Sequence, residues 1–91
     1  MASFYVKVYG KKECGLCKSS FKKVEHLIDA IEDDVELYYI DMDTIDGASE
    51  ADWEDVTDIP TVILLDVGLN EVGRWVGKKA PDSAEFLNYL S

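Results

Sequence analysis

The chain has 91 residues, of which 47% are hydrophobic and 31% are charged, and its formal net charge is −10. This length predicts one domain over residues 1–91 that can bury a core alone, and we expect a monomer. The acidity argues against nucleic-acid binding, for which a basic face is typical. No apolar run approaches the ~20 residues of a membrane span, and no signal-peptide pattern opens the chain. We therefore expect a cytoplasmic protein with no membrane partner.

The first part of the chain predicts a β-α-β unit. Residues 3–9 alternate and are rich in β-branched and aromatic types, which predicts a strand. Residues 18–31 predict a helix, and residues 35–40 predict a second strand. The helical spacing is carried by the apolar residues Phe21, Val24, Ile28 and Ile31. Two strands joined in this way are expected to be parallel, with a right-handed crossover.

The middle of the chain predicts a short helix and then a buried strand. Residues 48–56 suit a helix with Trp53 and Val56 on one face. We expect six aromatic side chains to pack rather than to bind a ligand, and Trp75 is the best candidate for an exception: Trp53, Tyr38, Tyr39, Trp75, Phe86 and Tyr89. Residues 61–65 form a nearly continuous apolar run, which is typical of a strand buried on both faces.

The end of the chain predicts a hairpin and a third helix. A short turn leads from the buried strand to residues 71–76, which should therefore run antiparallel to it. Asp82 is the expected N-cap of the last helix, with Glu85 three residues further on. The complete order is β-α-β-α-β-β-α, an α/β fold with a four-stranded mixed sheet flanked by helices.

Charge is distributed unevenly along this sequence. Residues 1–23 hold six lysines and one acid, whereas residues 24–73 hold sixteen acids and no Lys or Arg. The acidic stretch is typical of a solvated surface that keeps a protein soluble. The basic part also contains the only two cysteines of the chain.

Those cysteines, Cys14 and Cys17, form a Cys-Gly-Leu-Cys motif between the first strand and the first helix. The positive end of a helix stabilises a thiolate, which is the reactive form of cysteine, and Lys11, Lys12 and Lys18 should add to this effect. Cys17 lies within reach to close a disulfide and should be the more buried thiol. A structural staple is disfavoured, because so small a loop removes little unfolded-state entropy. This spacing near a β-α-β unit indicates redox chemistry.

Three features together resemble the thioredoxin/glutaredoxin family over nearly the whole chain. They are the element order, the dithiol at the first strand–helix junction, and Ile59-Pro60-Thr61 just before the third strand. The resemblance implies the thioredoxin fold and a cis peptide bond at Ile59–Pro60, with Pro60 beside the dithiol. It also implies that the Gly77 loop lies beside the Pro60 loop, so that Lys78 and Lys79 would complete a basic rim.

The function that the resemblance implies is thiol–disulfide exchange with protein disulfides, contributing to cell redox homeostasis. The catalytic residues would be Cys14 and Cys17, with no cofactor other than their disulfide. A reductase like thioredoxin reductase, or glutathione, would supply electrons. The expected substrate-binding residues are Ile59, Pro60, Thr61, Gly77, Lys11 and Lys12.

Some positions depart from the family pattern and leave alternatives open. Val8 stands where thioredoxins carry a buried acid, and Glu13 and Leu16 replace residues usual around the motif. A glutathione-dependent enzyme and a non-catalytic binding module are therefore alternatives, with an iron–sulfur or metal site less favoured. His26 should face away from the cysteines, and two thiolates alone fill half of a tetrahedral zinc site. We therefore expect no metal.

Overall fold

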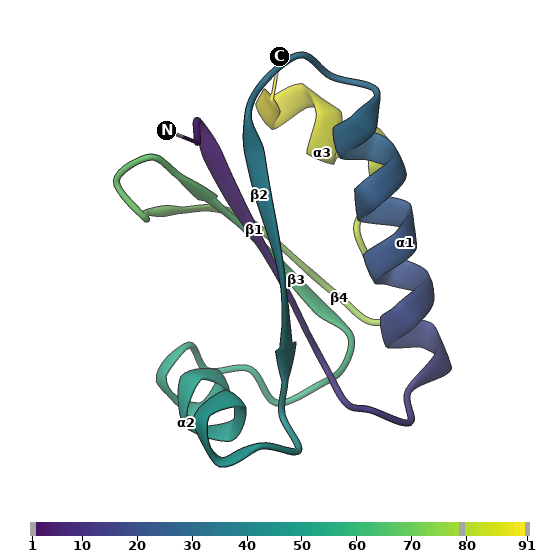
Figure 1. The fold of residues 1–91 in the computed structure, drawn as a ribbon, viewed down its shortest axis with the longest axis vertical. Helices are drawn as coiled ribbons and strands as arrows, with labels where there is room; N and C mark the ends of the chain where they lie inside the picture. Colours follow the sequence, from purple (N-terminus) through teal and green to yellow (C-terminus); the bar gives the residue numbers. More distant parts are fainter. Residues whose placement is uncertain (1, 79, 91) are drawn as a thin grey trace.

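The structure is a computed structural model of the chain, described here for residues 2–78 and 80–90 (Figure 1). The predicted order of seven elements is confirmed, and their bounds differ from the predicted ones by no more than three residues. The elements are β1 (Phe4–Gly10), α1 (Gly15–Asp29), β2 (Val35–Asp41), α2 (Ile45–Trp53), β3 (Thr61–Asp66), β4 (Glu71–Val76) and α3 (Ser83–Leu90).

The four strands form one mixed sheet in the order β2-β1-β3-β4. β1 and β2 are parallel, as predicted, whereas β3 runs antiparallel to both β1 and β4. In this register Tyr9 lies opposite Thr61. The end of β1 and the start of β3 therefore meet at the same end of the sheet, which is also where the chain turns into α1 (Figure 1).

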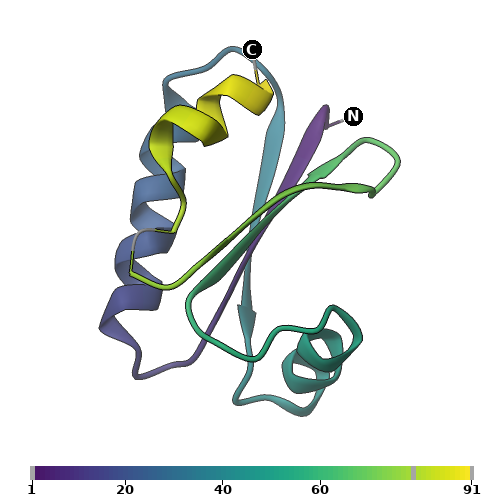
Figure 2. The ribbon, with the colours of Figure 1, turned by 180° about the vertical axis from the view of Figure 1, so that it is seen from behind.

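Helices cover the two faces of the sheet unequally. α1 and α3 lie against one face, and α2 lies against one end of the other face (Figures 1 and 2). The larger core cluster lies under α1 and α3 and includes Val8, Val24, Trp75 and Phe86. A smaller cluster lies under α2 and consists of Tyr9, Ala51, Val56, Ile63 and Leu65. Neighbouring residues of β1 thus belong to opposite cores, as the alternation of a strand requires.

The short helix α2 corrects one prediction. It begins earlier than the apolar spacing suggested, because the Thr44 hydroxyl accepts the Gly47 N–H at 2.9 Å and caps the helix. It ends at Trp53, and Asp55 then adopts a left-handed φ of 57° that turns the chain. Val56 is buried beyond the helix, whereas Trp53 is 85% exposed. The predicted shared helical face of Trp53 and Val56, and the packing of Trp53, were therefore wrong.

The other two helices agree better with the sequence. α1 is the longest at 15 residues, and its buried side chains include Cys17 and Val24. The predicted cap of α3 is confirmed, because the Asp82 carboxylate accepts the Glu85 N–H at 3.2 Å. In the part of the chain that the structure describes, no helix is both long and apolar enough to cross a membrane.

Candidate redox site

Cys14 is the N-cap of α1. Its backbone is extended, with φ −120° and ψ 102°, and its Sγ accepts the N–H of Cys17 at 3.1 Å. This sulfur therefore occupies the place of the side-chain oxygen that usually satisfies the first free N–H groups of a helix. It lies at the positive end of α1, where a negative charge on sulfur is stabilised.

The two cysteines are bonded as a disulfide, with their Cα atoms 5.2 Å apart. Cys14 is half-buried, whereas Cys17 has no exposed surface. The prediction that Cys17 is the more buried sulfur is confirmed. A reagent that arrives from solvent can therefore reach Cys14 but not Cys17.

Gly10, at the end of β1, allows Cys17 to sit against the sheet. A Cβ atom at position 10 would lie 2.6 Å from the Cys17 Cβ and 2.8 Å from its Sγ. Both distances are well inside ordinary van der Waals contact. The same Cβ would also meet the hydroxyl of Tyr39 at 2.5 Å. Only glycine fits here without moving the redox centre.

The loop between β1 and α1 is held by two hydrogen bonds to the β2 end of the molecule. The Tyr39 hydroxyl donates to the Lys11 carbonyl at 2.7 Å, and the Lys12 N–H donates to the Asp43 carboxylate at 3.1 Å. Both lysine side chains are exposed beside Cys14 in sequence. Tyr39 was expected only to pack, and no sequence signal marked it as the residue that anchors this loop.

Pro60 and Gly77 are joined directly. The Gly77 N–H donates to the Pro60 carbonyl at 2.8 Å, and Gly77 has a φ of +90°, which favours glycine. The Ile59–Pro60 peptide bond is cis, Pro60 is buried, and the Thr61 hydroxyl donates to the Asp58 carbonyl at 2.6 Å. These two loops therefore lie side by side, as the resemblance implied.

The Pro60 loop also lies at the dithiol end of the sheet. Thr61 pairs with Tyr9, and Tyr9 precedes the glycine that abuts Cys17. The role of the residues at this end in binding a substrate stays a prediction. A second cis bond, at Ala80–Pro81, was not predicted; the Pro81 carbonyl accepts the Lys23 ammonium at 2.6 Å and ties this loop to α1.

The structure describes only part of the expected basic rim around the dithiol. Lys11, Lys12, Lys18 and Lys78 are exposed, and none of their ammonium groups has an ion pair or hydrogen bond within the described residues. Lys79 lies outside the described residues. Three of these four lysines, Lys11, Lys12 and Lys18, belong to the loop and helix that carry the cysteines.

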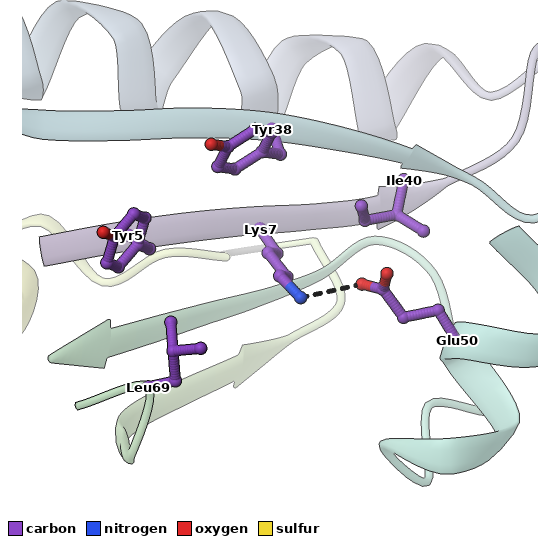
Figure 3. A pocket seen from close by; sticks show the side chains of 6 residues that line it. All are labelled: Tyr5, Lys7, Tyr38, Ile40, Glu50 and Leu69. Atoms are coloured by element: carbon purple, nitrogen blue, oxygen red, sulfur yellow. Dashed lines mark hydrogen bonds and ion pairs between the residues drawn. The ribbon is translucent and has the colours of Figure 1, made fainter. Parts of the chain in front are cut away.

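A polar group that the sequence did not suggest lies on the opposite face of the sheet. The Glu50 carboxylate accepts both the Lys7 ammonium at 3.0 Å and the Tyr9 hydroxyl at 2.9 Å. Burial and this hydrogen bond raise the pKa of Tyr9 far above its usual range. The pair Lys7–Glu50 borders an open hollow of about 380 Å³ between β1, β2 and α2 (Figure 3). Tyr5, Tyr38, Ile40 and Leu69 also line this hollow.

Trp75 is a packing residue rather than part of the site. It is 8% exposed, and its ring lies 5.6 Å from that of Phe86 and 6.0 Å from that of Tyr89. Its indole N–H has no hydrogen-bond partner among the described residues. Tyr39 and Phe86 also pack as predicted, whereas Tyr38 and Tyr89 are more than two-fifths exposed.

Metal-ligating side chains do not cluster near the cysteines. Within residues 2–78 and 80–90, no three His, Cys, Asp or Glu side chains gather where they could hold a metal ion. His26 is exposed near the last turn of α1, well beyond the cysteines along the helix.

No protein-family model matches the sequence, and no curated protein is detectably similar to it. Solved structures are similar in fold. Fasciola hepatica thioredoxin has 27% identity and a TM-score of 0.77, with 99% of this chain and 83% of that chain covered. The chain has the fold of the thioredoxin-like superfamily. Oxidised mitochondrial thioredoxin 3 from Saccharomyces cerevisiae is 25% identical, with a TM-score of 0.76 over 100% of this chain and 81% of that chain. A designed protein reaches a TM-score of 0.81 at 19% identity, with 98% of this chain and 82% of the designed chain covered.

The thioredoxin fold and its Cys14–Cys17 pair fit a redox role. The predicted α/β architecture with a four-stranded mixed sheet is confirmed.

Proposed function

We propose that this thioredoxin-like protein is a thiol–disulfide oxidoreductase that reduces or exchanges disulfides in other proteins. The observation that carries the proposal is the position of Cys14, a half-buried residue that caps α1 and bonds to the fully buried Cys17. Cys14 is the nucleophile, and Cys17 resolves the intermediate.

The reaction balances with two electrons and two protons. In the reduced protein, the Cys14 thiolate attacks one sulfur of a substrate disulfide, and the other substrate sulfur leaves and takes a proton. The Cys17 thiol loses its proton and attacks Cys14 Sγ, which releases the second substrate thiol. The substrate is reduced to a dithiol and the Cys14–Cys17 disulfide forms.

Backbone groups next to Pro60 support the binding of an extended substrate. No hydrogen bond joins the N–H or C=O of Ile59 to another described residue. Ile59 is half-buried at the dithiol end of the sheet, where a substrate strand could pair with it. The Pro60 carbonyl, by contrast, is already occupied by Gly77.

Insulin reduction with dithiothreitol tests the proposal. Wild-type protein should accelerate precipitation of the insulin B chain, and Cys14→Ser should lower the rate to background. Cys17→Ser should instead accumulate a mixed disulfide on Cys14, which mass spectrometry of a trapped complex would identify. A wild-type rate equal to background would refute the proposal.

The electron donor is a second part of this proposal. After each cycle the Cys14–Cys17 disulfide must be reduced again, either by a dithiol protein similar to thioredoxin reductase or by glutathione. We propose the dithiol donor, because the sequence after Val76 does not contain a recognisable form of the paired glycines and acidic residue that help glutaredoxins hold glutathione. Reduction of the disulfide by glutathione at a rate comparable with that of a thioredoxin reductase would instead support the glutathione-dependent alternative.

A further inference from the structure

A groove of about 310 Å³ runs along α1 beside the redox site and is lined by Lys18, Phe21, Lys22, Glu25 and Tyr39. The rings of Phe21 and Tyr39 meet edge to face, with centroids 5.6 Å apart, and supply aromatic surface to the groove. Both side chains are only half-buried, so part of this aromatic surface stays exposed to solvent.

The near end of the groove lies one helical turn from the reactive cysteine. The Lys18 N–H donates to the Cys14 carbonyl at 3.2 Å, and the Tyr39 hydroxyl donates to the carbonyl of Lys11 in the adjoining loop. A chain segment that lies in the groove and continues past Lys18 would therefore run toward Cys14.

The charges on the groove are not compensated by this chain. Lys18 and Lys22 have no acidic partner within the described residues, although the chain carries nineteen acids. Lys22 lies three residues before Glu25, the only acid of the lining, and the two form no ion pair. The end nearest Cys14 is therefore positive, and the far end carries the single negative charge.

We propose that this groove binds the segment flanking the reacting cysteine of an acidic partner protein. An apolar side chain of that segment packs on Phe21 and Tyr39, and a neighbouring carboxylate pairs with Lys18 and Lys22. This inference rests on the proposed function and names its substrate class. Positive charge beside the dithiol attracts acidic partners and repels basic ones, which affects association rate and selectivity more than affinity.

Peptide substrates test the docking directly. Three fluorescence-quenched disulfide peptides would carry Asp-Leu, Lys-Leu or Asp-Ser beside the same cysteine, and kcat/KM would be measured with dithiothreitol. An exposed ion pair contributes little, so we expect a preference of about two- to fivefold for Asp-Leu over Lys-Leu at low salt. The preference should approach one at high salt. Asp-Ser should be weaker than Asp-Leu, because it has no apolar side chain for the aromatic surface.

A matched pair of variants localises the effect. Lys22→Gln and Ser49→Glu each make the net charge more negative by one, but Ser49 is exposed on α2, against the other face of the sheet. The preference for Asp-Leu should fall in Lys22→Gln and persist in Ser49→Glu. Equal losses in both variants would assign the preference to overall charge and overturn the groove.

A binding measurement separates this inference from the proposed function. A cysteine-free Asp-Leu peptide titrated into the protein should shift the amide NMR signals of Phe21 and Tyr39 and leave that of Ser49 in place. Absent shifts, or equal turnover of all three peptides, would overturn the docking, whereas failure to cleave any peptide would refute only the oxidoreductase. If the wild-type protein is a dimer and Lys22→Gln makes it a monomer, a second copy of the chain fills the groove, and this result also overturns the proposal.

Discussion

Replacing Gly10 with alanine should damage both stability and redox activity. The added Cβ would approach the Cys17 Cβ to 2.6 Å, its Sγ to 2.8 Å and the Tyr39 hydroxyl to 2.5 Å. The hydroxyl could swing away only by breaking its bond to the Lys11 carbonyl. The Cys17 atoms belong to the first turn of α1 and can move only with it. Overpacking of this kind costs about 1–3 kcal/mol, which in a domain of this size lowers Tm by about 4–8 °C for each kcal/mol.

Gly15→Ala is the matched control on the other side of Cys14. Nothing lies within 4 Å of a Cβ added at Gly15, which is the first residue of α1. Alanine in a helix is favoured over glycine by roughly 0.5–1 kcal/mol, so Tm should rise slightly. Thermal unfolding would measure both variants, and insulin reduction would follow activity. Because a misplacement of about 1 Å can cost about 100-fold in rate, we expect Gly10→Ala to lose on the order of tenfold. Unchanged Tm and activity in Gly10→Ala would refute the reasoning.

Three further substitutions test other parts of the structure. Tyr9→Phe removes the hydroxyl that donates to Glu50 and should cost about 1 kcal/mol in urea unfolding. Because the pKa of Tyr9 is raised in the folded state, its contribution to the free energy of unfolding is complete below about pH 10 and is lost as pH rises further. The free energy of unfolding of Tyr9→Phe should therefore fall less steeply at alkaline pH than that of the wild type, and an equally steep fall would contradict this. Asp82→Ala removes the cap of α3 and should cost about 1 kcal/mol in the same assay. Trp53→Phe should change the free energy of unfolding by less than about 0.5 kcal/mol. Since Trp53 is 85% exposed and Trp75 only 8%, this variant should also lose most of the quenching of tryptophan fluorescence by acrylamide, and persistent quenching would show that Trp75 is accessible.

The features that the sequence predicted well depend on neighbours in the chain. The dithiol at the start of a helix, the alternating strand over residues 3–9 and the cap at Asp82 are each set by residues a few positions apart. The cis bond at Ile59–Pro60 was implied by the family resemblance rather than by local pattern, and the structure contains it. The helix over residues 48–56 was misplaced because Thr44, an N-cap residue, lies outside the apolar pattern.

The features that the sequence could not predict join residues distant in the chain. Tyr39 and Lys11 are 28 positions apart, Tyr9 and Glu50 are 41 apart, and Lys23 and Pro81 are 58 apart. None of these pairs follows from periodicity or composition, because each depends on the packing of one element against another. The groove along α1 was missed for the same reason, since Tyr39 reaches it from β2.

The unequal exposure of the two sulfurs has a consequence for oxidative damage. In the reduced protein a peroxide from solvent would meet Cys14 first, because Cys17 has no exposed surface. A sulfenic acid formed on Cys14 would lie within bonding reach of Cys17, since the two residues already form a disulfide. Condensation to that disulfide competes with further oxidation to the irreversible sulfinic acid. Cys17 therefore protects Cys14, and the product, formed with loss of water, is the same Cys14–Cys17 disulfide, which the proposed electron donor would reduce.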